Sequence, residues 1–329
     1  MRTLSKADWD AFEHSWGFKR HPLLPDVYGT DVLVSDLFEN WRAVCEKSVE
    51  TVKRNEEEIN QLFIETYHLN ETVSPEVDWK DITVRLADKN RETKSLLSFA
   101  VGCMFGRYSL SIPGIAFAGG TWDPSKYKTF VPDKDGIIPI SDDEYFEDDI
   151  VGRFVPFIEI VYGKEVLEEN LRYIADALGG KGAARDIIRN YFINSFFEDH
   201  CNIYSVTGSW KRPIYWLFDS GKKNGFKCLI YMHRYQPDTI ARIRTDYIHE
   251  QQSRYRTAIA DLKQRINGAS TSVKVKLSKQ LTTLQAQADE IRVYEEKIHH
   301  LADRMIRIDL DDGVKHNYEI FKDVLAKIK

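Results

Sequence analysis

Apolar residues recur at alternating intervals of four and three residues over two stretches of the sequence, and this spacing constrains the fold more than any other feature. The first stretch runs from Ile248 to Ile266 and the second from Leu277 to Ile308, with the polar segment NGASTS (267–272) between them. Such intervals place apolar side chains along one side of a helix, as in a coiled coil. Because the connecting segment is short, the sequence predicts an antiparallel helical hairpin over these residues.

A second local pattern is the segment KRPIYWLFDSGKKNGFKCLIYMHRY (211–235), which is typical of two strands joined by a turn. Asn224-Gly225 favours a tight turn, because both residues tolerate positive φ. Neither strand alternates between polar and apolar residues, so both faces of the hairpin are expected to be covered. Tyr215, Trp216 and Phe218 are therefore predicted to lie in the core. Stacking of these rings on an unpaired base is the alternative.

The remaining elements follow from apolar periodicity and from the placement of proline and glycine. We expect a long helix that begins after Ser35 as N-cap and runs to about His68, and a helix over 141–163 with a capping serine, Ser141. The other predicted elements are a turn with a short strand (74–86), a buried helix with an exposed first half (88–108), loops with short strands (109–140), and two helices (164–178 and 183–204).

Together these elements predict an α+β fold that is predominantly helical. A mixed globular module containing the β-hairpin would be flanked by long helices, including the antiparallel helical hairpin. The predicted division has three parts: an N-terminal irregular segment and long helix (1–72), a mixed α/β module (73–236), and the helical hairpin with a C-terminal tail (237–329).

Composition restricts the cellular setting and the partners of the chain. Its 329 residues contain 43% hydrophobic residues and carry a formal net charge of −5, so any surface for nucleic acid must be local. The N-terminus lacks the apolar run of a signal peptide, and the longest apolar stretch, Leu96 to Phe105, is too short to span a membrane. Four scattered cysteines without CxxC spacing indicate a reduced, cytoplasmic protein and argue against a zinc site.

No pattern of catalytic residues is present. The sequence has neither a glycine-rich phosphate loop nor a GxSxG turn, and the adjacent His200 and Cys201 cannot serve as base and nucleophile for each other. The acidic run at 142–149 could bind a cation, but a helix N-terminus that favours negative charge explains it better. We therefore predict no catalytic, metal-binding or cofactor-binding residue.

Local charge is strongly segregated along the chain. Residues 211–234 carry six cations and one anion, 242–279 carry nine cations and three anions, and 141–169 carry ten anions and two cations. Such segregation is typical of a protein with one face against phosphate, although solvated lysines and arginines are a common alternative. The candidate DNA-binding residues are Lys211, Arg212, Lys222, Lys223, Lys227, Arg234, Arg242 and Arg244.

Within this set, we assign two different roles. Lys222, Lys223, Arg242 and Arg244 are expected to contact phosphates, which carry no sequence information. Arg212 and Arg234 are the candidate base readers, because an arginine fork can bind both acceptors of a guanine edge.

Four blocks resemble the C-terminal part of the PglX family, the adenine-specific DNA methyltransferases of BREX phage defence. They are SLLSFAVGCMFGRYSL (95–110), RPIYWLFDSGKKNGFKCLIYMHRY (212–235), DTIARIRTDYIHE (238–250) and IDLDDGVKHNY (308–318). The N-terminal SKADWDAFEHSWGFKRHPLL is similar to the segment that follows the catalytic domain in that family. The family's glycine-rich S-adenosylmethionine loop and Asn-Pro-Pro-Tyr motif occur nowhere in this sequence, so no catalytic residue carries over and no cofactor is expected in this chain.

The resemblance implies that 73–236 is a target-recognition module of a DNA-specificity region. The implied partners are double-stranded DNA, a methyltransferase catalytic domain in cis or in trans, and other phage-defence subunits; S-adenosylmethionine would belong to the full-length family member. The alternative is a helical scaffold that docks other defence subunits without reading DNA. A scaffold predicts an exposed apolar stripe along 277–308, whereas DNA recognition requires the β-hairpin and the 242–265 helix to share one basic face.

Overall fold

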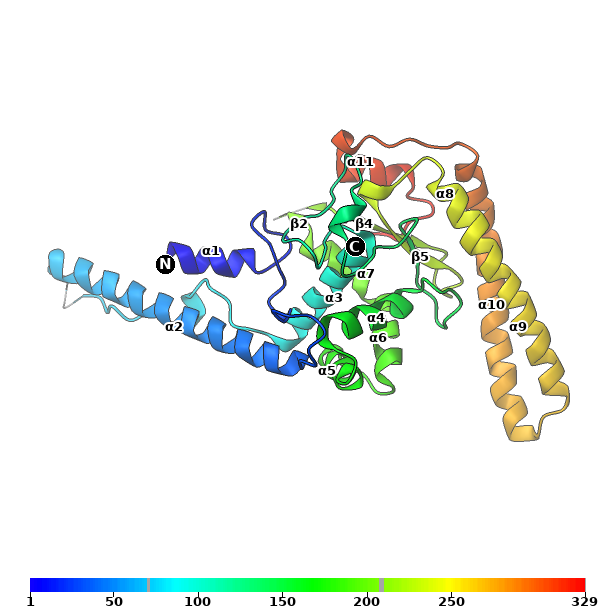
Figure 1. Cartoon of the computed structure of the whole chain (residues 1–329), viewed down its shortest axis with the longest axis horizontal. Coiled ribbons are helices and arrows are strands. Elements are labelled where there is room, and N and C mark those ends of the chain that lie inside the picture. Colours follow the sequence, from blue (N-terminus) through cyan, green and yellow to red (C-terminus); the bar gives the residue numbers. More distant parts are fainter. Residues whose placement is uncertain (70–71, 207–209, 329) are drawn as a thin grey trace.

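Two long helical projections leave the molecule on different sides of a mixed α/β body (Figure 1). The structure is a computed structural model that describes residues 1–69, 72–206 and 210–328. One projection is α2 (Val34–Thr66), and the other is the pair α9 (His249–Asn267) and α10 (Thr271–Ala302), which lie side by side and antiparallel. The fold is α+β and mainly helical, as predicted, and the helical hairpin is confirmed.

The body is built on a small antiparallel sheet with the strand order β1-β5-β4. β4 (Tyr215–Asp219) and β5 (Lys227–Tyr231) form the predicted hairpin, and β1 (Ile137–Pro139) pairs with the other edge of β5. A separate short pair joins β2 (Ser205–Val206) to β3 (Trp210–Lys211).

Aromatic side chains on both faces of β4 confirm that the hairpin is covered on both sides. The Tyr215 ring stacks on Phe105 at a centroid distance of 5.2 Å, whereas Trp216 packs edge-to-face against Tyr318 at 6.0 Å. Tyr215, Trp216 and Phe218 are all fully buried, so they are core residues and cannot stack on a base.

Helices enclose this sheet, and one continuous apolar core reaches from Phe18 to Leu325. Buried rings and branched side chains from α3, α4 and α6 contribute much of that core. The helices of the body are α1 (Arg2–Asp10), α3 (Lys89–Phe105), α4 (Ile150–Tyr162), α5 (Leu167–Leu178), α6 (Ala184–Asn194), α7 (Phe196–Ile203), α8 (Thr239–Arg242) and α11 (Gly313–Ile320). None of the described helices combines the length and apolar character that crossing a membrane requires.

The helical hairpin buries the apolar positions that its spacing predicted, but only in part. Tyr255 and Leu262 of α9 are buried, as are Ile291 and Ile298 of α10, whereas Leu284 is only half-buried. The chain enters α9 from α8 through a π-helical turn, Ile243–Ile248, so the helix begins before the predicted start of the apolar repeat. The most fully buried positions, Tyr255, Ile291 and Ile298, lie where the pair adjoins the body, whereas most residues between Leu262 and Leu277 are exposed.

Two helix starts were predicted at the wrong residue. α2 begins at Val34, and Ser35 makes no capping bond; instead the Val34 amide donates to Oδ1 of Asn170 in α5 at 2.8 Å. α4 begins at Ile150, and Ser141 lies outside it. At α2 the first free amide is satisfied by Asn170, which the tertiary structure brings close. At α4 the first free amides are satisfied by Asp149, which lies next to the start of the helix.

Further sequence expectations were wrong for reasons of packing. Residues 74–86 contain a 3₁₀ turn, Trp79–Asp81, in place of the predicted strand. The first half of α3 is largely buried: Glu92 is 1% exposed and accepts hydrogen bonds from Arg91 and from the Trp41 indole. The predicted helix over 183–204 is divided into α6 and α7 at Ser195.

Candidate nucleic-acid interface

The tip of the β-hairpin is fixed to α10 by a single carboxylate. Glu290 accepts hydrogen bonds from the Ser220 hydroxyl at 2.8 Å, the Lys223 amide at 2.9 Å and the Gly225 amide at 3.0 Å. From α9, the Tyr255 hydroxyl donates to the Gly225 carbonyl at 2.9 Å. These bonds hold the turn in the seam between α9 and α10, so the tip is an ordered platform for its side chains.

Lys222 and Lys223, the tip lysines, present their side chains to solvent from this platform. Both residues are exposed, and neither ammonium group makes an ion pair or hydrogen bond with any described residue. The Asn224 amide donates to the Gly221 carbonyl at 3.2 Å, so Lys222 and Lys223 are the central residues of a tight turn. Asn224 has a positive φ of 56°, but Gly225 does not adopt that conformation, so the turn lies two residues earlier than the Asn224-Gly225 pair predicted. Their charge is therefore free to meet a phosphate.

A groove of about 580 Å³, here called the lysine groove, begins beside the tip. It runs between the hairpin on one side and α6 and α7 on the other, and Lys222, Lys227 and Lys327 line it together with the amides of Asn194 and Asn224. Lys327, which belongs to the C-terminal segment, was missed from the sequence. The Leu325 bridge to Phe218 brings that segment beside β4, and no local pattern announces this pairing.

Four of the eight predicted DNA-binding residues are free of partners. Besides the tip lysines, Lys211 is partly exposed and Arg212 is exposed, and no described residue pairs with either side chain. Lys211 and Arg212 precede β4, whereas the tip lysines follow it. The five residues of β4 therefore set the two pairs of cations about 15 Å or more apart.

The other four predicted residues are held by partners within the protein. Lys227 pairs with Asp219 at 3.3 Å, Arg242 with Asp238 at 2.9 Å, and Arg244 with Glu295 at 2.6 Å. Arg234 donates to the carbonyls of Asp133 and Lys134 at 2.7 and 3.0 Å, and its guanidinium lies 4.6 Å from the centre of the Trp122 ring.

Arg234 joins the end of the β-hairpin to the loop at 133–134, a structural role that was not predicted from the sequence. Each terminal nitrogen uses one of its two protons on a backbone carbonyl, and these bonds hold the guanidinium beside Trp122, so fewer donors are left for a guanine edge and their orientation is fixed. Arg212 is the candidate base reader whose guanidinium remains free.

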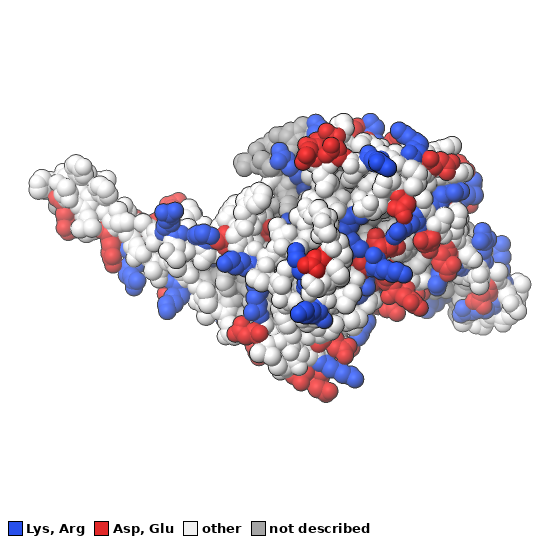
Figure 2. All heavy atoms as spheres, turned by 45° about the horizontal axis from the view of Figure 1, so that its top comes forward, with Lys and Arg blue, Asp and Glu red and all other residues white. Residues whose placement is uncertain are grey.

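The predicted segregation of charge along the chain is weakened in three dimensions. Cationic and anionic side chains are interspersed on the face shown in Figure 2. On α9 and the turn before it, Arg244, Arg254 and Arg265 each pair with a carboxylate, at 2.6, 3.0 and 3.1 Å. Other exposed cations of α9 and α10, such as Arg256, Lys263 and Lys274, have no partner among the described residues, so the hairpin tip is one of several surfaces with unpaired positive charge. The tip is the one that adjoins the lysine groove.

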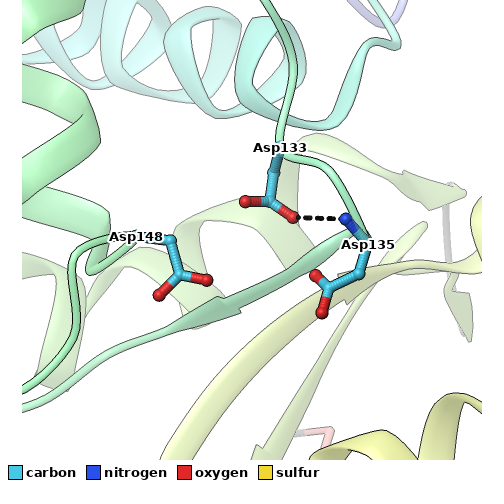
Figure 3. A group of neighbouring side chains, drawn as sticks. All are labelled: Asp133, Asp135 and Asp148. Carbon is cyan, nitrogen blue, oxygen red and sulfur yellow. Dashed lines mark hydrogen bonds between the residues drawn. The ribbon is translucent and has the colours of Figure 1, made fainter. Parts of the chain in front are cut away.

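Three aspartates from two segments of the chain converge beside β1. Figure 3 shows Asp133 and Asp135 on the loop before β1 and Asp148 just before α4, with the Asp135 amide donating to Asp133 at 3.1 Å. One carboxylate oxygen from each lies within 4.8 Å of the others, so the group could hold a cation with oxygen ligands. The Asp133-x-Asp135 spacing was visible in the sequence, but Asp148 reaches them only through the fold.

Tyr247 adds a side-chain hydroxyl to the backbone amides that donate to Asp133 and Asp135. Its hydroxyl lies 2.7 Å from Asp148 and 3.1 Å from Asp135. One hydroxyl proton cannot satisfy two carboxylates at once. Burial, together with the neighbouring Asp133, raises the pKa of Asp135 to about 6, and burial also raises the pKa of Asp148. Protonation of an aspartate is therefore the simplest way to reduce repulsion here.

We expect Asp135→Asn to stabilise the protein more at pH 7.5 than at pH 4.5. The ordinary pKa of the carboxyl is 3.8 and its folded value is about 6, so the folded protein binds the extra proton. This group's contribution to stability is therefore lost as pH rises through that interval. The measurement is the thermal midpoint of both proteins from pH 4.5 to 7.5, with the exposed Asp289→Asn as control. If the thermal midpoints of Asp135→Asn and the unaltered chain differ by the same amount at every pH, the expectation is contradicted.

Comparison with known proteins places the chain beside two methyltransferases. No protein-family model matches it. It is 44% identical over 321 residues to "Adenine-specific methyltransferase PglX" of Lacticaseibacillus casei (strain Zhang), across 95% of this chain. It is 36% identical over 354 residues to "Adenine-specific methyltransferase BrxX" of Escherichia coli O9:H4 (strain HS), across 99% of this chain. Over nearly its whole length the chain is thus similar to one region of these methyltransferases, here called the PglX-like region.

The PglX-like region corresponds to only part of each relative. It spans 26% of the length of the first and 29% of the second. The resemblance inferred from the sequence blocks is therefore confirmed for the region itself. The activity that the relatives' names state is an activity of much longer proteins.

Proposed function

We propose that this PglX-like region is the non-catalytic DNA-recognition part of an adenine-specific methyltransferase. It would bind double-stranded DNA and direct a catalytic domain, in cis or in trans, to its target. The observation that carries the proposal is the pair of tip lysines: two unpaired cations on a turn that Glu290 holds rigidly, at the mouth of a groove with further lysines. Preorganised cations of this kind suit a phosphate backbone.

Phosphate contact explains why the tip is fixed although its side chains are free. A lysine on a mobile turn would lose the freedom of that turn on binding, whereas here the backbone is already ordered by α9 and α10. The free Arg212 lies towards the other end of β4 and is the residue proposed to read a base. The engaged Lys227, Arg234 and Arg244 would support the surface without touching DNA.

We expect replacement of both tip lysines by alanine to weaken binding to every duplex alike. Two lost phosphate contacts should lower the slope of log affinity against log salt by about 1.8, since each contact contributes about 0.9. The measurement is a salt titration of duplex binding by fluorescence anisotropy. The matched control is Lys274→Ala/Lys276→Ala on the distal turn of α10, which removes equal charge far from the groove. Unchanged affinity and slope in the tip variant would refute this role for the hairpin.

The second candidate function is that of a helical scaffold. The exposed apolar side chains of α2 favour it, whereas those of α10 do not. Within 277–308, the main apolar positions Leu277, Ile291 and Ile298 are buried, so the stripe that a scaffold would need there is not exposed. The far end of α2, however, presents Leu62, Phe63 and Tyr67, which are 63%, 58% and 65% exposed. Co-elution of the chain with a PglX-type catalytic domain, abolished by Phe63→Ser, would support the scaffold even if the tip lysines proved irrelevant to DNA.

A further inference from the structure

A second hollow lies on the opposite side of α7 from the lysine groove. Its volume is about 550 Å³, and it is bounded by the end of α1, the first turns of α3 and the end of α7. Glu198 and Cys201 of α7 line the lysine groove, whereas Asp199 and Asn202 line this second hollow. One helix, with a diameter of about 10 Å, therefore separates the two.

Aromatic rings form one wall of this hollow, here called the aromatic pocket. Trp9 meets His14 edge-to-face at 4.5 Å, and His14 lies nearly parallel to Phe12 at 6.1 Å. Trp9 is 55% exposed, so much of its indole is available to another ring. Burial and the nearby Arg85 lower the pKa of His14, which keeps its ring uncharged at neutral pH.

The charges around the pocket are balanced in pairs. Its cations are Arg85, Arg91 and Lys94, and they pair with Asp8 at 3.0 Å, Glu92 at 2.7 Å and Asp199 at 3.0 Å respectively. No net positive charge is left to attract a phosphate. The pocket therefore suits a neutral, flat, polar ring better than an anion.

Polar groups at the pocket can bind the edge of such a ring. The carboxamide of Asn202 is exposed and has no partner among the described residues, so both its donor and its acceptor are free. Asparagine can bind a base edge through two parallel hydrogen bonds. Glu13, 5% exposed on the pocket wall, is held by the Ser98 hydroxyl and by the Tyr204 hydroxyl at 3.3 Å, so its carboxylate is fixed in position.

We propose that the aromatic pocket binds one unpaired nucleobase of a DNA molecule held at the tip lysines. This inference rests on the proposed function. A nucleotide that leaves the stack rotates about its own backbone, while its phosphates stay in place. A duplex seated at the lysine groove could then place one base across α7 and against Trp9. The neutral aromatic wall supplies stacking, and Asn202 supplies an edge for hydrogen bonds.

The test compares two duplexes of one sequence, fully paired or with a single unpaired 2-aminopurine, bound to the full chain. We expect the bulged duplex to bind about tenfold more tightly, since stacking of one base on an aromatic side chain has this order of effect. The 2-aminopurine fluorescence should fall on binding, as the base stacks on the indole. Trp9→Ala and Asn202→Ala should remove the preference and leave affinity for the paired duplex unchanged.

The control is Trp79→Ala, which removes an indole of similar exposure (61%) outside the pocket and should preserve the preference. Equal binding of both duplexes by the unaltered chain would overturn the inference and leave the proposed function intact. A preference that survives Trp9→Ala would overturn it as well, because the unpaired base would then not be stacked on that indole. If neither duplex binds, the proposed function fails and the inference fails with it.

Discussion

Asp149→Ala is expected to lower the free energy of unfolding by about 4 kcal/mol, because it breaks a buried ion pair and removes a helix cap at once. The Asp149 side chain is completely buried. Its carboxylate accepts from the Arg189 guanidinium at 2.9 Å, from the Val151 amide at 3.0 Å and from the Ser141 hydroxyl at 3.0 Å. Without it, the buried Arg189 would keep a charge with no buried partner.

Chemical denaturation of three variants separates the two contributions. Asp149→Asn keeps an oxygen for the first amides of α4 but loses the charge that balances Arg189, so its effect should be intermediate. Glu147→Ala removes an exposed carboxylate two residues earlier and should change stability by less than about 0.5 kcal/mol. A loss below about 1 kcal/mol for Asp149→Ala would show that the pair does not support the fold as described.

Gly225→Ala is expected to destabilise the protein by about 3 kcal/mol and to weaken duplex binding. A Cβ atom at this position would lie 2.6 Å from the Gln287 carbonyl oxygen and 3.2 Å from the Ile291 nitrogen. Both atoms belong to the backbone of α10, which cannot move aside without separating the helix from the body. The hairpin tip would have to leave the seam, and the Glu290 bonds to Lys223 and Gly225 would be lost with it.

Gly268→Ala is the matched control for this substitution. Gly268 lies in the turn between α9 and α10 at φ −97°, and a Cβ there meets no atom within 4 Å. We expect its urea midpoint to equal or slightly exceed that of the unaltered chain, because alanine restricts the unfolded state. Equal midpoints for both alanine variants would mean that the tip does not dock on α10 in solution, and the rigid platform proposed for Lys222 and Lys223 would be wrong.

The helical hairpin and the β-hairpin could be predicted because their determinants are local. Apolar spacing of four and three residues fixes one side of a helix wherever that helix lies, and two apolar runs around a short polar segment predict a β-hairpin, although the turn lies at 221–224 and not at Asn224-Gly225. The start of α2 could not be predicted in the same way. Its first amide is satisfied by Asn170, a residue 136 positions away, and the prediction that the nearby Ser35 caps the helix was therefore wrong.

The candidate interface was predictable only as a region. The sequence identified the cationic segment around the hairpin, and Lys222 and Lys223 are exposed and unpaired as that hypothesis requires. Their contact with DNA stays a prediction, as does the three-part division of the chain. The engagement of Arg234 by backbone carbonyls could not be foreseen, because its partners at 133 and 134 are remote in the chain.

The sequence by itself determined the class of fold, the two hairpins and the buried aromatic strands, since periodicity and turn chemistry act over a few residues. Only the tertiary structure decided which charges are free, which carboxylates converge at Asp133, Asp135 and Asp148, and which hollows flank α7. The physical reason is that a charged side chain is paired or free according to whether an opposite charge or a hydrogen-bond partner lies next to it. A partner is set by distance in space, and chain folding brings Glu290 to residue 223, 67 positions away in the sequence, and Asp148 to Asp135 across the intervening strand β1.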